Sequence, residues 1–523
     1  MCKLLELYSD KVVGAISGWD RIRFRGTIRW LSSTRGINAY LGTAGILLKD
    51  FAKWAGSVTE RVRAACAARA KALGIPLMYL RSSGIDKEAL ARHVAKERGI
   101  DTGDICMFSV VEPCRAPQVR GNRAERTLHV EVAPRKCVFV YHYWNDPVLG
   151  FGHTRLQTWV PLSVTVCING RHWLERQLLA ESIKYVKDGN CFPFIADLGR
   201  AQELLDLQLK TNWPGLLDPL LRRNCPTVDE VFDHGPLSYY WSADETEWAT
   251  DIVFRSTADL EAIYPSLLRH GLVAAQSPAV MRFFGKSAGQ DKACGRAPKE
   301  IVSDHRTRYE GARLKHWLNG NSIKAYNKAG NLLRLETTIN NPRDFKVYRQ
   351  PNDDPSQPMS WQKMRKGVSD LHRRAEVSQA CNDRYAEHLA SAGVTGTLQG
   401  IAGDTCKPVI KKARRHRALN PWSTGDHRLL QFIARGENSI NGFRNRGMRE
   451  YLYHEATESS DKAGRRKLSG RVTRHIRLLL AHGLVKKVAR TTRYVLTAKG
   501  QKVSTAILTA SAVEIQRLMD MAA

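Results

Sequence analysis

Apolar and polar residues alternate in the stretch between His316 and Arg343. Apolar residues recur at every second position in two short runs, which is typical of half-buried strands. Ala329-Gly330-Asn331 separates the runs and is typical of a hairpin turn, because Gly and Asn tolerate positive φ. The pattern therefore predicts two paired strands, and their polar positions are Lys324, Tyr326, Lys328, Arg334 and Glu336.

The pattern elsewhere predicts an α+β fold with a mixed or antiparallel central sheet. The segment from Pro76 to Cys114 alternates strand, helix and strand, and 127–170 has the pattern of an antiparallel meander. Leucines spaced by three and four residues predict a packed helical insert at 171–224. A second long helix is predicted at about 360–392.

A chain of 523 residues exceeds one ordinary domain. Four regions are expected from the composition and the pattern. They are a basic helical N-terminal region at 1–75, an α+β body at 76–345, a helix with a basic linker at 346–423, and a separate module at 424–523.

The module at 424–523 has the pattern of three helices followed by two short strands and a further helix. It resembles the winged helix of MarR-type transcription regulators, and this resemblance implies that the third helix enters the major groove of DNA. Winged helices also mediate protein contacts, so that alternative stays open. The resemblance implies that the following residues face nucleic acid, the last two from the wing: Arg471, Thr473, Arg474, Arg477, Arg490 and Arg493.

The charge supports a polyanionic partner. Lys and Arg total 81 against 51 Asp and Glu, a formal net charge of +30, and the cations are spread along the whole chain. Nucleic acid is the most economical partner for such a surplus. A membrane partner is not expected, because no apolar run of spanning length and no secretory signal is present.

Arginine and aromatic residues alternate near the N-terminus. Arginine binds phosphate through bidentate hydrogen bonds, and exposed aromatic rings stack bases, so a nucleic-acid contact is one interpretation. The other is a basic strand whose aromatic residues face the core. The residues concerned are Arg21, Arg23, Arg25 and Arg29, interleaved with Trp19, Phe24 and Trp30.

Eleven cysteines show no CxxC pair and no zinc-finger spacing, which favours a reduced, cytoplasmic protein without structural disulfides. A zinc site built from scattered ligands stays open. His142, Asp146 and His153 surround one turn and could ligate a metal, or they could be ordinary turn residues.

The predicted hairpin carries residues suited to phosphodiester chemistry. Its pattern K-x-Y-x-K, a turn and L-R-x-E-x-T resembles the core of rolling-circle replication initiators and relaxases. The resemblance implies that Tyr326 attacks DNA and that Glu336 binds Mg²⁺ or Mn²⁺. Asn327 departs from it, because the family usually has an acidic residue there. Asp251, at a predicted strand edge, could be a second metal ligand or a capping residue.

These observations favour a metal-dependent DNA-nicking or strand-transfer enzyme of mobile-element or replication-initiator type. Lys324, Lys328 and Arg334 would stabilise the charge that develops on phosphate. One alternative is a protein that binds structured RNA or DNA without catalysis, and another is a transcription regulator with a large sensor body. The sequence leaves the choice between DNA and RNA, and the oligomeric state, open.

Overall fold

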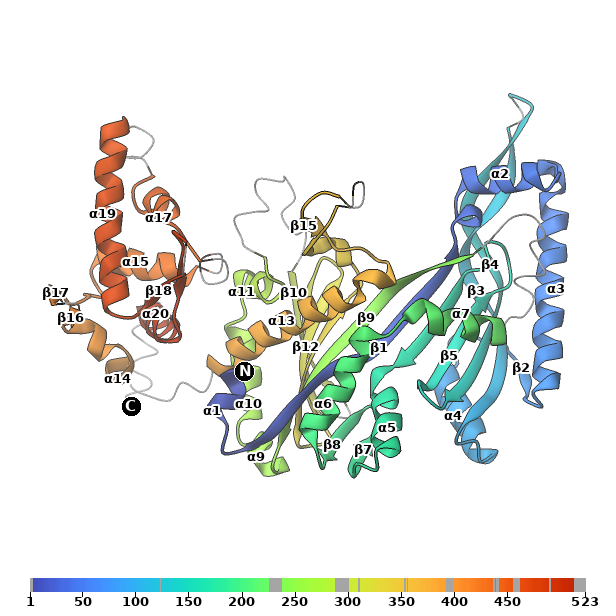
Figure 1. Ribbon diagram of the computed structural model, residues 1–523, viewed down its shortest axis with the longest axis horizontal. Helices are drawn as coiled ribbons and strands as arrows, with labels where there is room; N and C mark the ends of the chain where they lie inside the picture. The colour runs from blue at the N-terminus through green and yellow to red at the C-terminus, as the bar shows by residue number, and fades with distance from the viewer. Residues whose placement is uncertain are drawn as a thin grey trace.

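One large sheet organises the chain (Figure 1). The structure is a computed structural model that describes residues 3–122, 124–224, 238–286, 301–308, 311–351, 354, 356–391, 398–411, 413–435, 438, 442–454, 461–488 and 491–511. Its eleven strands follow the order β10-β11-β12-β13-β9-β1-β6-β5-β4-β3-β2. Every neighbouring pair is antiparallel except β2 and β3, so the predicted mixed sheet is confirmed.

The strands differ greatly in length. The three longest strands are β1, at the centre of the sheet, and β3 and β4, which form a long hairpin. In chain order the strands are β1 (Val12–Ile28), β2 (Leu77–Leu80), β3 (Gly103–Asn122), β4 (Thr127–Asp146), β5 (Gly150–Gln157), β6 (Val164–Asn169), β9 (Tyr239–Phe254), β10 (Ile301–Arg308), β11 (Gly311–Leu318), β12 (Asn321–Lys328) and β13 (Leu332–Ile339).

The N-terminal region at 1–75 was expected to be helical, and this expectation is wrong for the residues of strand β1. This strand pairs with β9 on one side and β6 on the other, in the middle of the sheet. Trp19, Ile22 and Phe24 are buried while the arginines between them are exposed, which is the period of a strand with one covered face. The interpretation in which these aromatic residues pack in the core is therefore correct for Trp19 and Phe24, whereas Trp30 is exposed.

Helices cover the two faces of the sheet unequally. One face, called the α13 face, packs Trp19, Phe24, Leu333 and Leu335 against helices that include the long α13. The helices of this face, as the shared cores show, are α2 (Thr34–Thr43), α3 (Phe51–Ala72), α7 (Trp213–Asn224), α10 (Tyr264–Val273), α11 (Ser277–Phe283) and α13 (Leu371–Ala390). Short helices α1 (Lys3–Leu7) and α9 (Thr257–Glu261) complete the body.

The opposite face, called the α5 face, is covered in part. Helix α4 (Lys87–Glu97) packs on β3 and β4, and α5 (Gly170–Ala180) with α6 (Leu198–Leu207) packs on β1. Between α5 and α6 the chain forms a hairpin of β7 (Tyr185–Asp188) and β8 (Cys191–Ile195). The segment expected to be a purely helical insert thus contains two strands, which matter for the site described below.

The part after the body differs in detail from the expectation. Ser360–Lys363 forms strand β15, paired with β14 (Lys346–Arg349), so α13 begins only at Leu371. The segment expected to be a linker holds α14 (Leu398–Ala402), β16 (Val409–Lys411) and β17 (Arg414–His416).

The C-terminal elements occur in the predicted order and share a core of their own, which includes Leu430, Val472 and Leu479. None of the helices in the described part of the chain is both long and apolar enough to cross a lipid bilayer. The C-terminal elements are α15 (Thr424–Ala434), α17 (Asn445–Leu452), α19 (Lys462–Ala481), β18 (Val485–Lys487), β19 (Tyr494–Leu496) and α20 (Ala498–Ser511).

Candidate metal centre

Three carboxylates from three neighbouring strands meet on the α5 face. Asp20 lies on β1, Glu247 on β9 and Glu336 on β13, and one oxygen of each lies within 4.8 Å of the others. Asp20 and Glu336 are buried, and Glu247 is nearly so. We call this group the carboxylate trio. Carboxylate oxygens at this separation are the ligands that Mg²⁺ and Mn²⁺ prefer.

A β-bulge places Asp20 and Arg21 on the same face of the sheet. Trp19 is paired with Trp248 and Arg21 with Glu247, so Asp20 is an extra residue on β1. A bulge of this kind turns two consecutive side chains toward one face of a sheet. Asp20 and Arg21 therefore both lie on the α5 face, while Trp19 remains in the core of the α13 face.

Lys324 and Tyr326 of β12 contact the carboxylate of Glu336. Lys324 lies directly across from Glu336, and its ammonium donates to Glu336 Oε1 and lies 3.5 Å from Glu247 Oε1. The Tyr326 hydroxyl donates to Glu336 Oε2 at 2.7 Å. Burial acts to raise the pKa of Glu336, but Lys324 and these hydrogen bonds outweigh it and hold the pKa below its usual range. The Glu336 carboxylate is therefore ionised at neutral pH.

The pKa values of Glu247 and Tyr326 are raised, whereas that of Glu336 is lowered. Burial, followed by the charge of Glu336, raises the pKa of Glu247 to about 7, against the partial opposition of Lys324 and Arg21. Burial and the charge of Glu336 also raise the pKa of the Tyr326 phenol well above its usual range. Glu247 can thus exchange a proton near neutral pH, whereas Tyr326 keeps its proton unless positive charge is brought close to it.

The raised pKa of Glu247 makes the stability of the fold pH-dependent. Folded Glu247 binds its proton more tightly than the unfolded chain does, so its contribution is fully present below the ordinary pKa of 4.5 and is lost as the pH rises through about 7. Between pH ~5 and ~8 we expect the free energy of unfolding of the wild type to fall by up to about 3 kcal/mol relative to Glu247→Gln. Urea unfolding of both proteins at several pH values tests this, and parallel curves would contradict it.

Asp251 is not part of the trio. It is fully buried and accepts from Arg334 Nε at 2.5 Å and Nη2 at 2.8 Å, while Arg171 Nη2 lies 3.0 Å away. Burial acts to raise the pKa of Asp251, but the two guanidinium groups lower it overall. The expectation that Asp251 ligates a metal beside Glu336 is therefore wrong, because the carboxylates within ligand distance of Glu336 are Asp20 and Glu247, and Asp251 is paired with two arginines outside that group.

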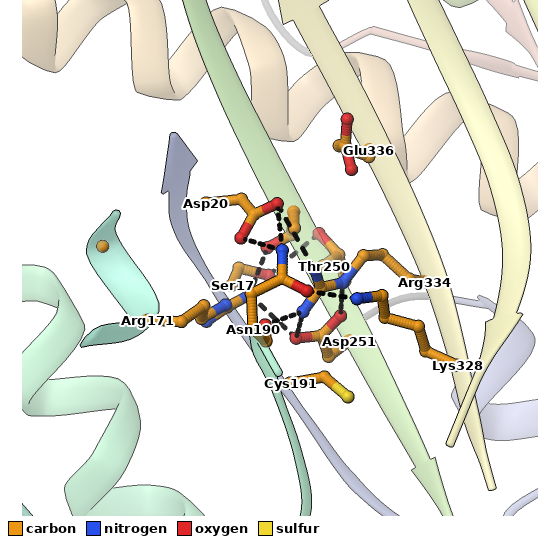
Figure 2. Close-up of polar contacts among 12 residues, drawn as sticks. Ser17, Asp20, Arg171, Asn190, Cys191, Thr250, Asp251, Lys328, Arg334 and Glu336 are labelled. Atoms are coloured by element: carbon orange, nitrogen blue, oxygen red, sulfur yellow. Dashed lines mark hydrogen bonds and ion pairs between the residues drawn. The ribbon is translucent and has the colours of Figure 1, made fainter. Parts of the chain in front are cut away.

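Arg334 and Lys328 also have partners other than an incoming phosphate. Arg334 is fully buried, and its Nη1 lies 3.4 Å from Asp20. Asn190, at the turn of the β7–β8 hairpin, donates to both Asp20 oxygens at 2.7 and 2.8 Å (Figure 2). Lys328 donates to Asn190 Oδ1, and Arg334 donates to the Asn190 carbonyl at 2.7 Å. These two cations, expected to bind phosphate, instead hold the residue that positions Asp20.

The arginines of β1 lie beside the trio on the α5 face. Their side chains are about half exposed, at 50% for Arg21, 44% for Arg23 and 49% for Arg25. Each pairs with a carboxylate of β9, and Arg21 reaches Glu245 at 2.6 Å and Glu247 at 3.1 Å. They are accessible to a ligand on this face, as is Arg29 at the end of the strand.

In the C-terminal module the described arginines expected to face nucleic acid are exposed: Arg471, Arg474, Arg477 and Arg493. Thr473 was also expected to face nucleic acid, but it is half-buried and its hydroxyl accepts a hydrogen bond from Asn445 of α17 at 3.0 Å. Arg490 lies outside the described residues.

The turn residues considered as a second metal site do not come together. The ring of His142 lies 3.0 Å from Asp104, whereas Asp146 accepts from the backbone of its own turn. His153 contacts Tyr143, which neighbours His142 on the strand and points to the opposite face. Among the described residues, the carboxylate trio is the group of His, Cys, Asp and Glu side chains that has metal-ligand geometry.

Sequence reasoning missed Asp20 and passed over Glu247 in favour of Asp251. A signal for Asp20 was present: apolar residues of β1 stand at Trp19, Ile22 and Phe24, so the period of two is interrupted once by an extra polar residue. Such an interruption is the sequence mark of a bulge. A scan against models of known protein families, a search of curated proteins and a search of solved structures found no match to this chain.

Proposed function

We propose that this protein is a metal-dependent enzyme that breaks and transfers phosphodiester bonds in DNA, as mobile-element and replication-initiator enzymes do. The convergence of Asp20, Glu247 and Glu336 beside half-exposed arginines carries the proposal. Three carboxylates bind one divalent cation well, and arginines bind the phosphates around it. The net charge of +30 supports a nucleic-acid partner.

The trio would hold Mg²⁺ or Mn²⁺, with Lys324 completing the charge balance. A divalent cation held there supplies positive charge that makes ionisation of a nearby hydroxyl and charge build-up on phosphate less costly. Tyr326 is the nucleophile in this proposal, because its hydroxyl already donates to Glu336. Its oxygen bonds to phosphorus while the phosphorus–oxygen ester bond opposite breaks, and the released end of the strand leaves with that oxygen and its electron pair. The phenolic proton passes to a carboxylate of the trio, and a proton from the trio neutralises the leaving oxygen as a hydroxyl.

The C-terminal module has a supporting role in the proposal. Its three helices and two short strands resemble a winged helix, and α19 presents the exposed Arg471, Arg474 and Arg477. A helix with cations along its exposed side suits the major groove. We therefore assign duplex recognition to this module and chemistry to the sheet.

Tyr326→Phe tests the nucleophile. The change removes one hydroxyl, so we expect the covalent protein–DNA adduct to disappear and cleavage to fall by at least about 100-fold, an effect within the range of a lost catalytic group. The measurement is a denaturing gel of labelled single-stranded and duplex DNA incubated with Mg²⁺ or Mn²⁺. Cleavage by Tyr326→Phe at the wild-type rate would exclude this tyrosine.

The matched control is Tyr141→Phe. Tyr141 also donates to a carboxylate, Glu112, at 2.9 Å, and Lys87 and Arg155 flank that carboxylate as Lys324 flanks Glu336. It lies on the same face of the sheet but outside the trio. Its loss should leave cleavage within a few-fold of the wild type.

A second candidate function is binding of structured RNA or DNA without catalysis. The contact of Lys324 with Glu336 and its approach to Glu247 favour it, because the ammonium already neutralises part of the trio. In that case divalent cations would change neither the melting temperature nor the affinity for nucleic acid. The two candidates therefore differ in their response to Mn²⁺.

A further inference from the structure

A row of side chains on the α5 face extends from the trio along β1. Arg21, Arg23 and Arg25 occupy alternate positions of the strand and point the same way. Because a strand rises about 3.4 Å per residue, their side chains recur about every 7 Å. That spacing is about twice the 3.4 Å rise per phosphate of a stacked strand. Each arginine of the row can therefore contact a phosphate of one strand, every second phosphate if the bases stay stacked and every phosphate if the strand is extended.

Aromatic groups stand at the far end of the row. Thr27 is paired with Tyr240, which places the Tyr240 ring on the face of the arginines. The guanidinium carbon of Arg29 lies 3.6 Å from the centre of that ring. Tyr240 is 39% exposed, and the neighbouring Trp30 is 57% exposed. Unpaired bases stack on aromatic rings and on guanidinium planes of this kind.

Carboxylates interleave with the arginines without covering them. Glu245 lies 2.6 Å from Arg21 and 3.8 Å from Arg23, and Asp244 lies 3.6 Å from Arg25. A guanidinium group has five N–H donors, so a carboxylate on one side leaves donors for a phosphate. The carboxylates therefore orient the row, and the guanidinium groups keep their exposed sides.

The row continues on the other side of the trio. Lys324 of β12 stands across from Lys315 of β11, and the Lys315 ammonium lies 4.3 Å from the centre of the Trp317 ring. Cations and aromatic rings thus occur on both sides of the carboxylates, along β1 on one side and on β12 and β11 on the other. A strand that contacts both groups would pass over the trio.

We propose that Arg21, Arg23 and Arg25 with the Arg29–Tyr240 pair form a track for single-stranded nucleic acid that leads an unpaired strand to the carboxylates. The proposal deepens the proposed function and rests on it for the chemistry at the trio, but binding to the track is independent of cleavage. A single line of cations ending in a stacking platform suits one backbone with free bases better than a duplex.

The test is fluorescence anisotropy in EDTA, with labelled oligo(dT), oligo(U) and a duplex of equal length. The wild type should bind both kinds of probe, the single strands through the track and the duplex through the C-terminal module. The triple variant Arg23→Gln/Arg25→Gln/Arg29→Gln should lose about 30-fold in single-strand affinity, and its slope of log affinity against log salt should be smaller by about 2. Tyr240→Ala should lose about 10-fold, because a stacking surface is removed.

The control is Arg63→Gln on α3. Arg63 is as exposed as Arg21, at 50%, and has a carboxylate partner, Glu60, at the same 3.1 Å as the Arg21–Glu247 pair. It lies on the helix of the α13 face and should bind as the wild type does. Circular dichroism and melting curves of each variant establish that it is folded.

Unchanged single-strand affinity in the triple variant, or an equal loss for single strands and duplex, would overturn the track. Its failure differs from that of the proposed enzyme. If the triple variant loses single-strand affinity while the wild type cleaves nothing with Mg²⁺ or Mn²⁺, the track stands and the enzyme fails. If the wild type cleaves and the triple variant binds and cleaves like it, the enzyme stands and the track fails. Equal binding of oligo(dT) and oligo(U) would support contacts to phosphates and base faces alone. A preference for one of them would identify the ligand of the track as DNA or RNA.

Discussion

We expect Glu336→Gln to lower metal-dependent strand cleavage by at least about 1,000-fold, and Asp20→Asn and Glu247→Gln to behave alike. An amide keeps the shape of a carboxylate and loses the charge that binds a divalent cation. A bound metal contributes several kcal/mol to phosphoryl-transfer transition states, and each 1.36 kcal/mol is tenfold in rate. Because the three oxygens lie within 4.8 Å of one another, the loss of any one removes a ligand from the same site.

Two measurements check this expectation. Cleavage rates with Mn²⁺ give the kinetic loss, and melting temperatures with and without Mn²⁺ report binding, since a ligand stabilises the folded state by RT ln(1 + [L]/Kd). The control is Glu203→Gln on α6, an exposed carboxylate with an arginine partner, Arg200, at 2.7 Å. A trio variant that cleaves normally would refute the assignment. A wild type whose melting temperature does not respond to Mn²⁺ would favour the binding protein.

Local chemistry of the site could be predicted from the sequence because it lies within one hairpin. Alternation and the Ala329-Gly330-Asn331 turn determine which residues of β12 and β13 are opposite one another. The pairing places Lys324 across from Glu336 and Tyr326 across from Arg334. Contacts between Glu336 and its hairpin neighbours therefore needed no knowledge of the rest of the chain.

The rest of the trio depends on pairing between strands that are far apart in the sequence. Asp20 and Glu247 are separated by more than two hundred residues and meet only because β1 and β9 are neighbours. Period-two alternation assigns residues to faces, but it does not specify the order of strands in a sheet. The bulge at Asp20 then shifts the alternation by one residue, so that Arg21 lies on the face of Asp20 and not on that of Trp19.

Arg334 and Asp251 show why residue type alone misassigned two site residues. An arginine near a glutamate suggests phosphate binding, and an aspartate at a strand edge suggests a metal ligand. Both side chains are buried between the sheet and the β7–β8 hairpin, which the sequence pattern did not predict. Once that hairpin covers them, their charges are satisfied by each other and by Arg171.

The largest effect on stability is expected from Asp251→Asn. Arg334 and Arg171 are both fully buried and share the Asp251 carboxylate as their anionic partner at 2.5 to 3.0 Å. Removing one partner of a buried ion pair leaves an uncompensated charge and typically costs about 3–5 kcal/mol. The asparagine can still accept one hydrogen bond and has nearly the same shape. The loss of stability therefore reports the removed charge and not a change in packing.

The matched control is Asp244→Asn, on the same strand. Asp244 pairs with Arg25 of β1 at 3.6 Å, but the Arg25 side chain is 49% exposed. An exposed pair contributes at most about 1 kcal/mol, because water solvates the charge that remains. Urea unfolding of the wild type and both variants at pH 7 gives the comparison directly.

The consequence of Asp251→Asn should extend to the trio, because Arg334 also holds Asp20 and Asn190. Without the Asp251 charge, the guanidinium group interacts more strongly with Asp20, whose oxygen lies 3.4 Å away, and competes with a metal for it. We therefore expect the variant to be less stable and also to bind Mn²⁺ more weakly, whereas Asp244→Asn changes neither. A loss of less than about 1 kcal/mol in Asp251→Asn would mean that water reaches the two arginines and that the buried network does not support the site.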